Sequence, residues 1–375
     1  MKNRLRLSIA IALTVLGAIA RGQGYAPGVV LVKFRPSARQ PFGTINRLHA
    51  RVERTVARLG IQRVRLAGGG SVMSAVAALR RDPDVLYAEP DYYVRIFDND
   101  PYFTRQWDLP IISAPQAWAI TTGNPLVLVA SLDTGADLTH PDLVGQIAAS
   151  KNLIGGGSAI DGNGHGTHTA GTIAALTNNG VGVASLGYHT RLLIGKVVAD
   201  NGQGDIQAVI DGIVWAETNG ARVITMSFGT TSSSSALQDA VSDAWNSGIV
   251  VVAAAGNYGT TQKVYPAACD GCIAVAATDE SDRRCSFSSF GDWVHLSAPG
   301  HNIISLYRSH GYAIMSGTSM AAPHVAALAA LLWANGARSN VSIYTALVNS
   351  ADATTGFNGF PAPRINARRA LLRLP

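Results

Sequence analysis

Residues 126–135 read Leu-Val-Leu-Val-Ala-Ser-Leu-Asp-Thr-Gly, and this stretch decides the fold class. Its nearly continuous apolar run predicts a parallel strand that is buried on both faces. The run ends in Asp133-Thr134-Gly135, so a carboxylate stands at the carboxyl end of the strand. Open α/β sheets place their sites at that edge. The stretch therefore predicts an α/β protein with a central sheet, although an aspartate of a turn or a helix N-cap would look the same by itself.

The composition narrows the class of protein. The chain has 375 residues, of which 47% are hydrophobic and 14% charged, with 39 glycines. These values are typical of a compact α/β enzyme with tight turns and exclude a disordered or coiled-coil protein. Residues 1–97 carry 16 Lys and Arg against 5 Asp and Glu, and residues 98–375 carry 14 against 19. The split predicts two parts that attract each other, with drift in surface composition as the alternative.

The N-terminus has the pattern of a secretory signal peptide. Three basic residues among the first six precede an apolar stretch from Leu7 to Ala20, which ends in the small-x-small sequence Ala18-Ile19-Ala20. A membrane span needs about 20 apolar residues, and this stretch is shorter. We therefore expect a signal peptide over residues 1–22, secretion, and no stable membrane anchor. No stripe of aromatic and basic residues indicates nucleic-acid binding.

Residues 23–97 predict a small domain of their own with a β-α-β-β-α-β order. The strands are expected over 29–34, 62–66, 85–88 and 92–96, and the helices over 44–59 and 71–79. The segment has no His pair, nucleophile or cluster of metal ligands beyond what chance would give. We therefore expect this domain to have no catalytic role. It would act either as a folding aid and inhibitor that is later removed or as a permanent accessory domain.

A second informative stretch is Asp161-Gly-Asn-Gly-His165-Gly-Thr-His168-Thr-Ala-Gly171. Small residues surround His165 and an Ala-rich stretch follows, so its ring is expected at the start of a helix and facing a cleft. An imidazole is the natural general base near neutral pH. The nearby His168 raises the alternative of a metal pair, but the metalloprotease pattern needs a Glu after the first His and a spacing of four. We interpret His168 as structural.

The third stretch is Gly317-Thr-Ser319-Met-Ala-Ala-Pro323-His324, which opens an apolar helix that extends to about Ala334. A serine at a helix start is often a cap. The free N–H groups and the dipole of that helix would, however, also favour negative charge that develops beside the serine. Pro323 is expected in the first turn, where a missing N–H is tolerated.

Together the three stretches supply an acid, a base and a nucleophile, the three roles of acyl transfer. Their chain order is Asp133, His165, Ser319. An α/β-hydrolase has the order Ser, acid, His and carries Gly-x-Ser-x-Gly, and a chymotrypsin-like enzyme has the order His, Asp, Ser. Only the order found in subtilisins fits.

On these residues, the chain from about Asn99 onward resembles the subtilisin-like serine proteases of the peptidase S8 family, and the thermitase branch especially. Further matching stretches are Asn99–Phe103, Ala253–Asn257, Tyr265–Ala268, Ser286–Gly291, Ser297–Gly300 and Arg364–Arg368. Residues 30–34 and 88–92 more weakly resemble the inhibitory propeptide of the family.

The resemblance implies a secreted serine endopeptidase that is made as a self-processed precursor, with cleavage near residues 95–98. Its catalytic domain, residues 98–375, would have the subtilisin-like three-layer α/β fold with a central, mostly parallel sheet. Residues 23–97 would form a small α+β, ferredoxin-like propeptide domain that acts as an intramolecular inhibitor. Polypeptides are the expected substrates, and the enzyme is expected to be a monomer.

The resemblance also implies the roles of individual residues. Ser319 would attack the substrate, His165 would move the proton and Asp133 would orient the imidazole. The Asn257 side chain and the Ser319 backbone N–H would bind the oxyanion, although Asn257 alone could be a turn residue. Two segments would pair with an extended peptide: Gly202, Gln203 and Gly204, and Ser227, Phe228 and Gly229. Phe228 stands where a smaller aliphatic residue is common, and a broad apolar or aromatic preference is expected.

One tight structural calcium site is likewise implied by the resemblance. Its ligands would be the carboxylates of Asp100 and Asp142, the amide oxygen of Asn179, and the backbone carbonyls of Leu176, Val181 and Val183. A simple turn is the alternative for the Asn179 region. A second calcium loop that relatives carry before the catalytic His is absent, because residues 151–160 hold no carboxylate.

Two further points stay open from the sequence. Secretion would permit one disulfide, between Cys285 and either Cys269 or Cys272, with one thiol left over.

Two rival functions are an esterase or lipase with the same triad and a binding protein on the same scaffold. The first lacks Gly-x-Ser-x-Gly, and the second would require the loss of a catalytic group, which has not occurred.

Overall fold

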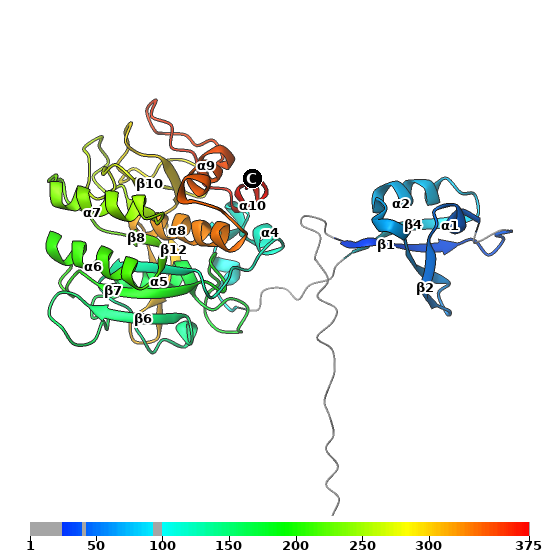
Figure 1. Cartoon of the computed structure of the whole chain (residues 1–375), viewed down its shortest axis with the longest axis horizontal. Coiled ribbons are helices and arrows are strands. Elements are labelled where there is room, and N and C mark those ends of the chain that lie inside the picture. The colour runs from blue at the N-terminus through cyan, green and yellow to red at the C-terminus, as the bar shows by residue number, and fades with distance from the viewer. Residues whose placement is uncertain (1–24, 40–42, 93–99, 375) are drawn as a thin grey trace, which may run out of the picture. The chain divides into compact units, whose positions relative to one another are not determined.

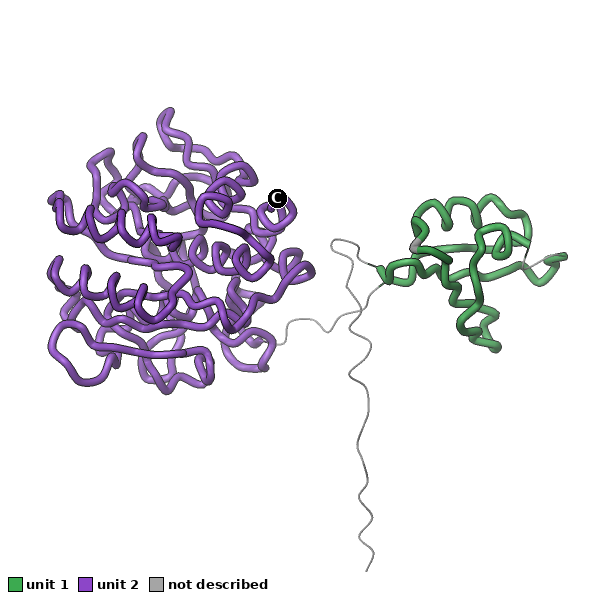
Figure 2. Tube along the Cα trace, in the orientation of Figure 1, with its two compact units in different colours: residues 1–95 green, residues 96–375 purple. Residues whose placement is uncertain are grey.

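The structure is a computed structural model that describes residues 25–39, 43–92 and 100–374. The contacts divide the chain into two compact units, residues 1–95 and 96–375 (Figure 2). The expected signal peptide over residues 1–22 and the expected cleavage region lie outside the described residues. In the described ranges no helix has both the length and the hydropathy needed to cross a membrane.

The N-terminal unit is a four-stranded antiparallel sheet with two helices, in the strand order β2-β3-β1-β4. Its elements are β1 (Tyr25–Phe34), α1 (Gly43–Arg47), β2 (Arg51–Val56), β3 (Ile61–Arg65), α2 (Val72–Arg80) and β4 (Val85–Tyr92). Val30 and Val32 of β1 are buried in one core with Val76 and Leu79 of α2. The observed β-α-β-β-α-β order and the ferredoxin-like arrangement agree with the expected fold class, but the individual elements expected from the sequence follow one another as β-α-β-α-β-β.

Two details of the N-terminal unit correct the prediction from sequence. The expected helix over 44–59 ends at Arg47, and Arg51–Val56 is a strand. Its β-branched residues fit an exposed edge strand, and the Glu53 carboxylate pairs with Arg63 and Arg65 across the sheet. The strand expected over 85–88 is β4, which extends to Tyr92, and the strand expected over 92–96 lies outside the described residues apart from Tyr92.

The second unit is built on a seven-stranded parallel sheet in the order β11-β10-β9-β8-β5-β7-β6. Its strands are β5 (Leu128–Asp133), β6 (Ile147–Asn152), β7 (Arg191–Lys196), β8 (Ala221–Met226), β9 (Val250–Ala254), β10 (Cys272–Thr278) and β11 (Leu296–Pro299). A separate antiparallel hairpin is formed by β12 (Ile303–Tyr307) and β13 (Gly311–Met315).

Helices cover both faces of this sheet (Figure 1). Along β5, Val129 belongs to the apolar cluster that contains residues of α5 (His165–Ala174) and α8 (Thr318–Ala334). Ala130 and Leu132 belong to the cluster that contains residues of α6 (Ile206–Thr218) and α7 (Ser235–Asn246). The helices of the unit are α3 (Asp108–Ile111), α4 (Ala114–Trp118), α5 (His165–Ala174), α6 (Ile206–Thr218), α7 (Ser235–Asn246), α8 (Thr318–Ala334), α9 (Asn340–Ser350) and α10 (Ala367–Leu372). The predicted three-layer α/β fold is confirmed.

The strand order decides where a site can form. Strands β7, β5, β8 and β9 are neighbours and run parallel, so their carboxyl ends meet at one edge. Asp133 is the last residue of β5, Ser227 follows β8, and Asn257 follows β9 by three residues. The topology therefore collects polar side chains from three separate parts of the chain.

Candidate active site

Asp133 and His165 form a direct contact in this structure. Asp133 ends β5 and His165 begins α5, and the His165 Nδ1 lies 2.7 Å from the Asp133 Oδ1. Burial alone would lower the pKa of His165, but the charge of Asp133 and this hydrogen bond raise it above its ordinary value. Because Nδ1 faces the carboxylate, Nε2 is the ring atom that remains available to another partner.

The Asp133 carboxylate is fixed by two further donors. The Thr134 backbone N–H donates to Oδ1 at 2.7 Å, and the Thr169 hydroxyl donates to Oδ2 at 3.2 Å. A Cβ on Gly166 would lie 2.1 Å from the Gly135 carbonyl oxygen, so only glycine lets α5 approach the end of β5 this closely. The position of His165 against Asp133 therefore depends on Gly166, the residue after His165.

A second buried carboxylate, Asp161, joins the two elements that carry Asp133 and His165. Its Oδ1 accepts hydrogen bonds from the Thr134 hydroxyl and from the backbone N–H groups of Asn163 and Gly164. Its Oδ2 accepts from both the backbone N–H and the hydroxyl of Thr167, at 2.8 and 2.7 Å. Asp161 thus binds the turn after β5 and the first turn of α5 at the same time.

Ser319 is the second residue of α8, which packs against α5. In this structure the Ser319 Oγ donates to the Ser227 carbonyl oxygen at 2.8 Å, and no hydrogen bond joins Ser319 to His165 among the described residues. A rotation about the Ser319 Cα–Cβ bond would release the hydroxyl from Ser227. The Ser319 backbone N–H belongs to the first turn of the helix, where N–H groups have no partner within the helix.

Pro323 corrects a detail of the sequence prediction. Helix α8 begins at Thr318, so Pro323 is its sixth residue and lies beyond the first turn. A proline at that position removes the N–H that would bond the carbonyl oxygen of Ser319, four residues earlier. The Ser227 hydroxyl donates to this oxygen instead, at 3.0 Å.

The Asn257 side chain is oriented by Thr318. The Asn257 Oδ1 accepts from the Thr318 backbone N–H at 2.9 Å and from the Thr318 hydroxyl at 3.0 Å. With its oxygen engaged, the amide turns its Nδ2 donor away from these groups. A Cβ on Gly317 would lie 3.3 Å from that Nδ2, so the glycine keeps the space beside this donor open.

Two cavities line this edge of the sheet. A cavity of about 290 Å³ is bordered by Ser227, Phe228, Gly229, Ala254, Gly256, Asn257, Tyr258, Val264, Thr318 and Ser319. A second, of about 510 Å³, is bordered by Gly202, Gln203, Gly204, Phe228, Gly229 and their neighbours. Both predicted peptide-binding segments therefore border cavities, and Phe228 and Gly229 border both. Neither segment is itself a strand.

The residues proposed for calcium come together around two buried carboxylates. Asp100 accepts from the backbone N–H groups of Asn178, Asn179 and Gly180. Asp142 accepts from the Asn179 side chain at 2.8 Å and from the Val183 N–H at 3.1 Å. Burial raises the pKa of Asp142 to about 6, and the charge of Asp100 adds to this effect.

The fit of this loop to a cation rests on its oxygens. Within the described part of the chain, the carbonyl oxygens of Leu176, Val181 and Val183 accept no hydrogen bond. An oxygen-only set with two carboxylates suits Ca²⁺. In this structure the Asn179 Oδ1 instead accepts from the Val181 N–H at 2.8 Å, so that amide would have to turn to act as a ligand.

The remaining histidine of the second stretch is structural. The His168 Nε2 lies 3.1 Å from the Ile303 carbonyl oxygen and 3.2 Å from that of Ala313. Burial lowers the pKa of His168 to about 4, so the ring is neutral near pH 7. No group of three or more His, Cys, Asp or Glu side chains able to hold a metal exists in the described ranges.

The cysteines do not form the disulfide that secretion would permit. Cys269, Cys272 and Cys285 are free and buried. Cys269 and Cys272 belong to the apolar cluster on the α6–α7 face of the sheet, and Cys285 belongs to the cluster on the opposite face. Burial raises the pKa of Cys269 to about 11, so its thiol stays protonated at neutral pH.

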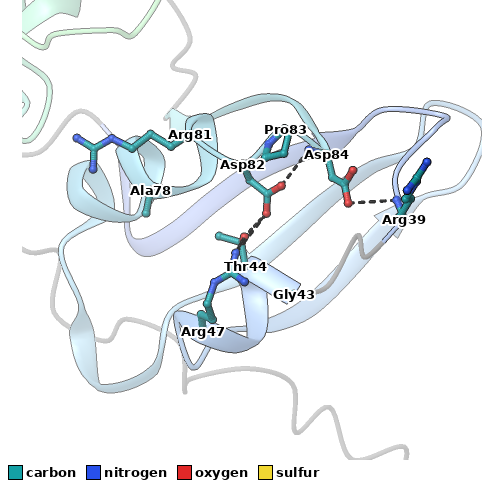
Figure 3. A pocket seen from close by; sticks show the side chains of 9 residues that line it. All are labelled: Arg39, Gly43, Thr44, Arg47, Ala78, Arg81, Asp82, Pro83 and Asp84. Atoms are coloured by element: carbon teal, nitrogen blue, oxygen red, sulfur yellow. Dashed lines mark hydrogen bonds and ion pairs between the residues drawn. The ribbon is translucent and has the colours of Figure 1, made fainter.

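The N-terminal unit has its own hollow, of about 500 Å³, which Figure 3 shows from close by. Two carboxylates take up contacts within it: Asp82 accepts from the Thr44 hydroxyl and lies 3.6 Å from Arg47, and Asp84 accepts from the Arg39 backbone N–H. The lining contains no His, Cys or Ser. These contacts are structural, and nothing in this hollow resembles the acid, base and nucleophile of the second unit.

Three features of the site were missed from sequence. No role was predicted for Asp161 itself, because its five hydrogen bonds join residues that are not adjacent in the sequence. Ser227 was expected only to pair with substrate as part of its segment, and the bond from its hydroxyl to the Ser319 carbonyl oxygen was missed. The third is a buried pair in which the His324 Nε2 lies 2.9 Å from the Asp108 Oδ2, and which links α8 to α3. The proline at position 323 could have signalled the role of the Ser227 hydroxyl, because it removes the usual helical donor to the Ser319 carbonyl oxygen.

Comparison with known proteins places the chain in a family. Residues 125–363 match the Peptidase S8 model, described as the subtilase family, and residues 18–91 match the fervidolysin N-terminal prodomain. Thermitase of Thermoactinomyces vulgaris is 46% identical over 276 residues, which cover 73% of this chain and 98% of thermitase. A thermophilic serine proteinase of Bacillus sp. strain AK1 is 42% identical over 80% of this chain and 76% of its own length.

A solved structure agrees with these relatives. A protease from Pseudoalteromonas arctica superposes with a TM-score of 0.68 at 31% sequence identity, covering 75% of this chain and 100% of its own. The predicted resemblance to the thermitase branch is confirmed. The chain belongs to the subtilase family: it is a thermitase-like serine endopeptidase with an N-terminal prodomain.

Proposed function

We propose that this serine endopeptidase cleaves peptide bonds with Asp133, His165 and Ser319 as its triad and Asn257 as an oxyanion donor. The observation that carries the proposal is the 2.7 Å contact between the His165 Nδ1 and the Asp133 Oδ1. It supports an imidazole that is oriented by a carboxylate and carries a raised pKa, as a general base in acyl transfer requires.

The reaction follows from these groups. The Ser319 Oγ attacks the scissile carbonyl carbon, and the His165 Nε2 takes the hydroxyl proton. The carbonyl oxygen becomes an anion beside the Asn257 Nδ2 and the Ser319 backbone N–H, both of which can donate to it. His165 then gives the proton to the leaving amine, and water releases the acyl group by the reverse sequence. Asp133 stabilises the imidazolium in both halves of the reaction.

The substrate is an extended polypeptide in this proposal. Glycines at 202, 204 and 229 permit close approach of a peptide backbone to the two bordering segments. The 290 Å³ cavity beside Ser319 is bordered by Ala254, Val264 and Phe228 and by no charged side chain. These walls support a broad preference for apolar or aromatic side chains before the cleaved bond.

The N-terminal part would be removed in steps. We assign residues 1–22 to a signal peptide for secretion, residues 23–97 to the propeptide and residues 98–375 to the mature catalytic domain. The match to a prodomain supports a propeptide that inhibits the enzyme until it is cleaved. The charge difference between residues 1–97 and 98–375 supports attraction between the two parts. The mature enzyme would act as a monomer.

One structural calcium ion would bind at the Asp100–Asp142 loop. The ligands would be Asp100, Asp142, the Asn179 amide, and the carbonyls of Leu176, Val181 and Val183. When bound, the ion would offset two buried negative charges and hold the loop that follows α5. It would have no part in the chemistry of the triad.

The proposal is tested by secretion of the full chain and of Ser319→Ala from a protease-deficient host. The unchanged chain should appear in the medium shortened to a new N-terminus near residues 95–98, and it should cleave a chromogenic peptide faster than a simple ester. Ser319→Ala should stay uncleaved and inactive on both substrates. A processed Ser319→Ala chain would refute self-cleavage, and an active one would refute the nucleophile.

A further inference from the structure

The helix that carries Ser319 has a missing donor directly at the nucleophile. Beyond the first turn of an α-helix, each backbone N–H ordinarily bonds the carbonyl oxygen four residues earlier. Pro323 has no N–H, and the carbonyl that it leaves without a helical donor is that of Ser319 itself. A part-buried carbonyl without any partner would cost free energy, so a replacement donor is expected.

Ser227 supplies that donor and also receives a bond in return. Its hydroxyl donates to the Ser319 carbonyl oxygen at 3.0 Å, and its own carbonyl oxygen accepts from the Ser319 hydroxyl at 2.8 Å. Ser227 is 4% exposed, so water competes poorly for these groups. The two residues are 92 positions apart in the chain, and Ser227 begins the segment proposed to bind substrate.

We propose that Ser227 is a positioning residue for the nucleophile, because its hydroxyl holds the Ser319 peptide group that Pro323 leaves unbonded. The bond fixes the plane of the peptide between Ser319 and Met320, and with it the direction of the Ser319 Cα–Cβ bond. It also ties the nucleophile to the segment 227–229 that borders both substrate cavities. The inference rests on the proposed role of Ser319.

The test is a double-mutant cycle with Ser227→Ala and Pro323→Ala in the full chain. Concentrations of active enzyme are set by titration with a fluorophosphonate. Ser227→Ala should lower kcat on a chromogenic peptide about 10-fold or more, with a smaller change in KM, since one part-buried acceptor loses its donor. Pro323→Ala restores an N–H four residues after Ser319. In that background Ser227→Ala should therefore cost less than about 3-fold, because the helix now supplies the bond.

The outcomes separate the two proposals. Unlabelled Ser319 in the unchanged enzyme would refute the proposed function itself. Labelled Ser319 with equal losses from Ser227→Ala in both backgrounds would refute the positioning role, since a packing effect is additive. If Ser227→Ala does not accumulate, Ser227→Thr and Ser227→Val decide. Threonine keeps the hydroxyl and should keep kcat at least 10-fold above valine, and equal values would overturn the inference.

Discussion

The two halves of the site are held in different ways. The acid–base half (Asp133, Asp161 and His165) is fixed by buried carboxylates, and Asp161 alone accepts five hydrogen bonds. The nucleophile half (Ser227, Asn257 and Ser319) is fixed by neutral bonds to carbonyl and amide groups at the start of α8. In the proposed mechanism, the groups that transfer the proton are thus positioned by charged contacts, and the attacking group is positioned by bonds to the backbone.

The difference indicates how each half responds to change. Charge-assisted hydrogen bonds are about twice as strong as neutral ones, so the acid–base half should be rigid before substrate arrives. The Ser319 hydroxyl bonds Ser227 in this structure, so the nucleophile half must rearrange by one side-chain rotation. Changes to the first half should therefore alter proton transfer, and changes to the second should alter attack and oxyanion binding.

The largest effect is expected from Asp133→Asn. The amide cannot stabilise an imidazolium and favours the wrong tautomer of His165, so kcat on a chromogenic peptide should fall about 10⁴-fold. The matched control is Asp239→Asn, which changes an exposed carboxylate on α7. Losses of similar size from both variants, or a loss below 10-fold from the first, would mean that Asp133 does not orient the base.

The next effect tests the nucleophile half. Asn257→Ala should lower kcat about 10²–10³-fold, the range already known for the equivalent donor in subtilisins. KM should change little, because the lost bond forms mainly in the transition state. Asn219→Ala removes an exposed amide after α6 and should leave kcat unchanged. A rise in KM without a fall in kcat would place Asn257 in ground-state binding instead.

Asp161→Asn sharpens the contrast between the halves. The new amide directs N–H donors at groups that are themselves donors, so the first turn of α5 should shift and kcat should fall about 10- to 100-fold. The labelling rate of Ser319 by a fluorophosphonate should fall with it. Asp211→Asn, on the exposed face of α6, is the control. Unchanged kcat would show that Asp161 caps the helix without positioning His165.

Much of the fold and of the candidate site could be predicted from the sequence, and part could not. The apolar run before Asp133 and the small residues around His165 predicted a buried strand and a helix start, because burial and close approach leave local patterns. The helix expected over 44–59 was wrong because an edge strand with few buried residues lacks such a pattern. The bond from Ser227 to Ser319 joins residues 92 apart, and no local pattern encodes it.

The pH dependence of activity reports on the acid–base half of the site. Asp133 raises the pKa of His165 above its ordinary value, and the base works only when neutral. Activity should therefore be full above that raised pKa and lost as pH falls through it, with the midpoint of kcat/KM above about 6.5. Asp133→Asn, assayed on an activated ester, should move the midpoint to lower pH. An unmoved midpoint would assign the acid limb to another group.

The smallest effect concerns the Asp100–Asp142 loop, away from both halves. Chelation of calcium should lower Tm by about 5 °C, because a ligand that binds only the folded state stabilises it. Added Ca²⁺ should restore Tm, and added Mg²⁺ should not. Asp142→Asn should remove the response to chelation, whereas Asp211→Asn should keep it. A Tm that chelation leaves unchanged in the unmodified enzyme would count against the site.

In the proposed mechanism His165 activates Ser319, and a fluorophosphonate probe tests this activation most directly. The probe reacts with an activated serine, and peptide mass spectrometry locates the adduct. We predict one adduct, on Ser319, in the mature enzyme, and its loss in His165→Ala. An adduct on another serine, no adduct, or equal labelling in His165→Ala would contradict the account.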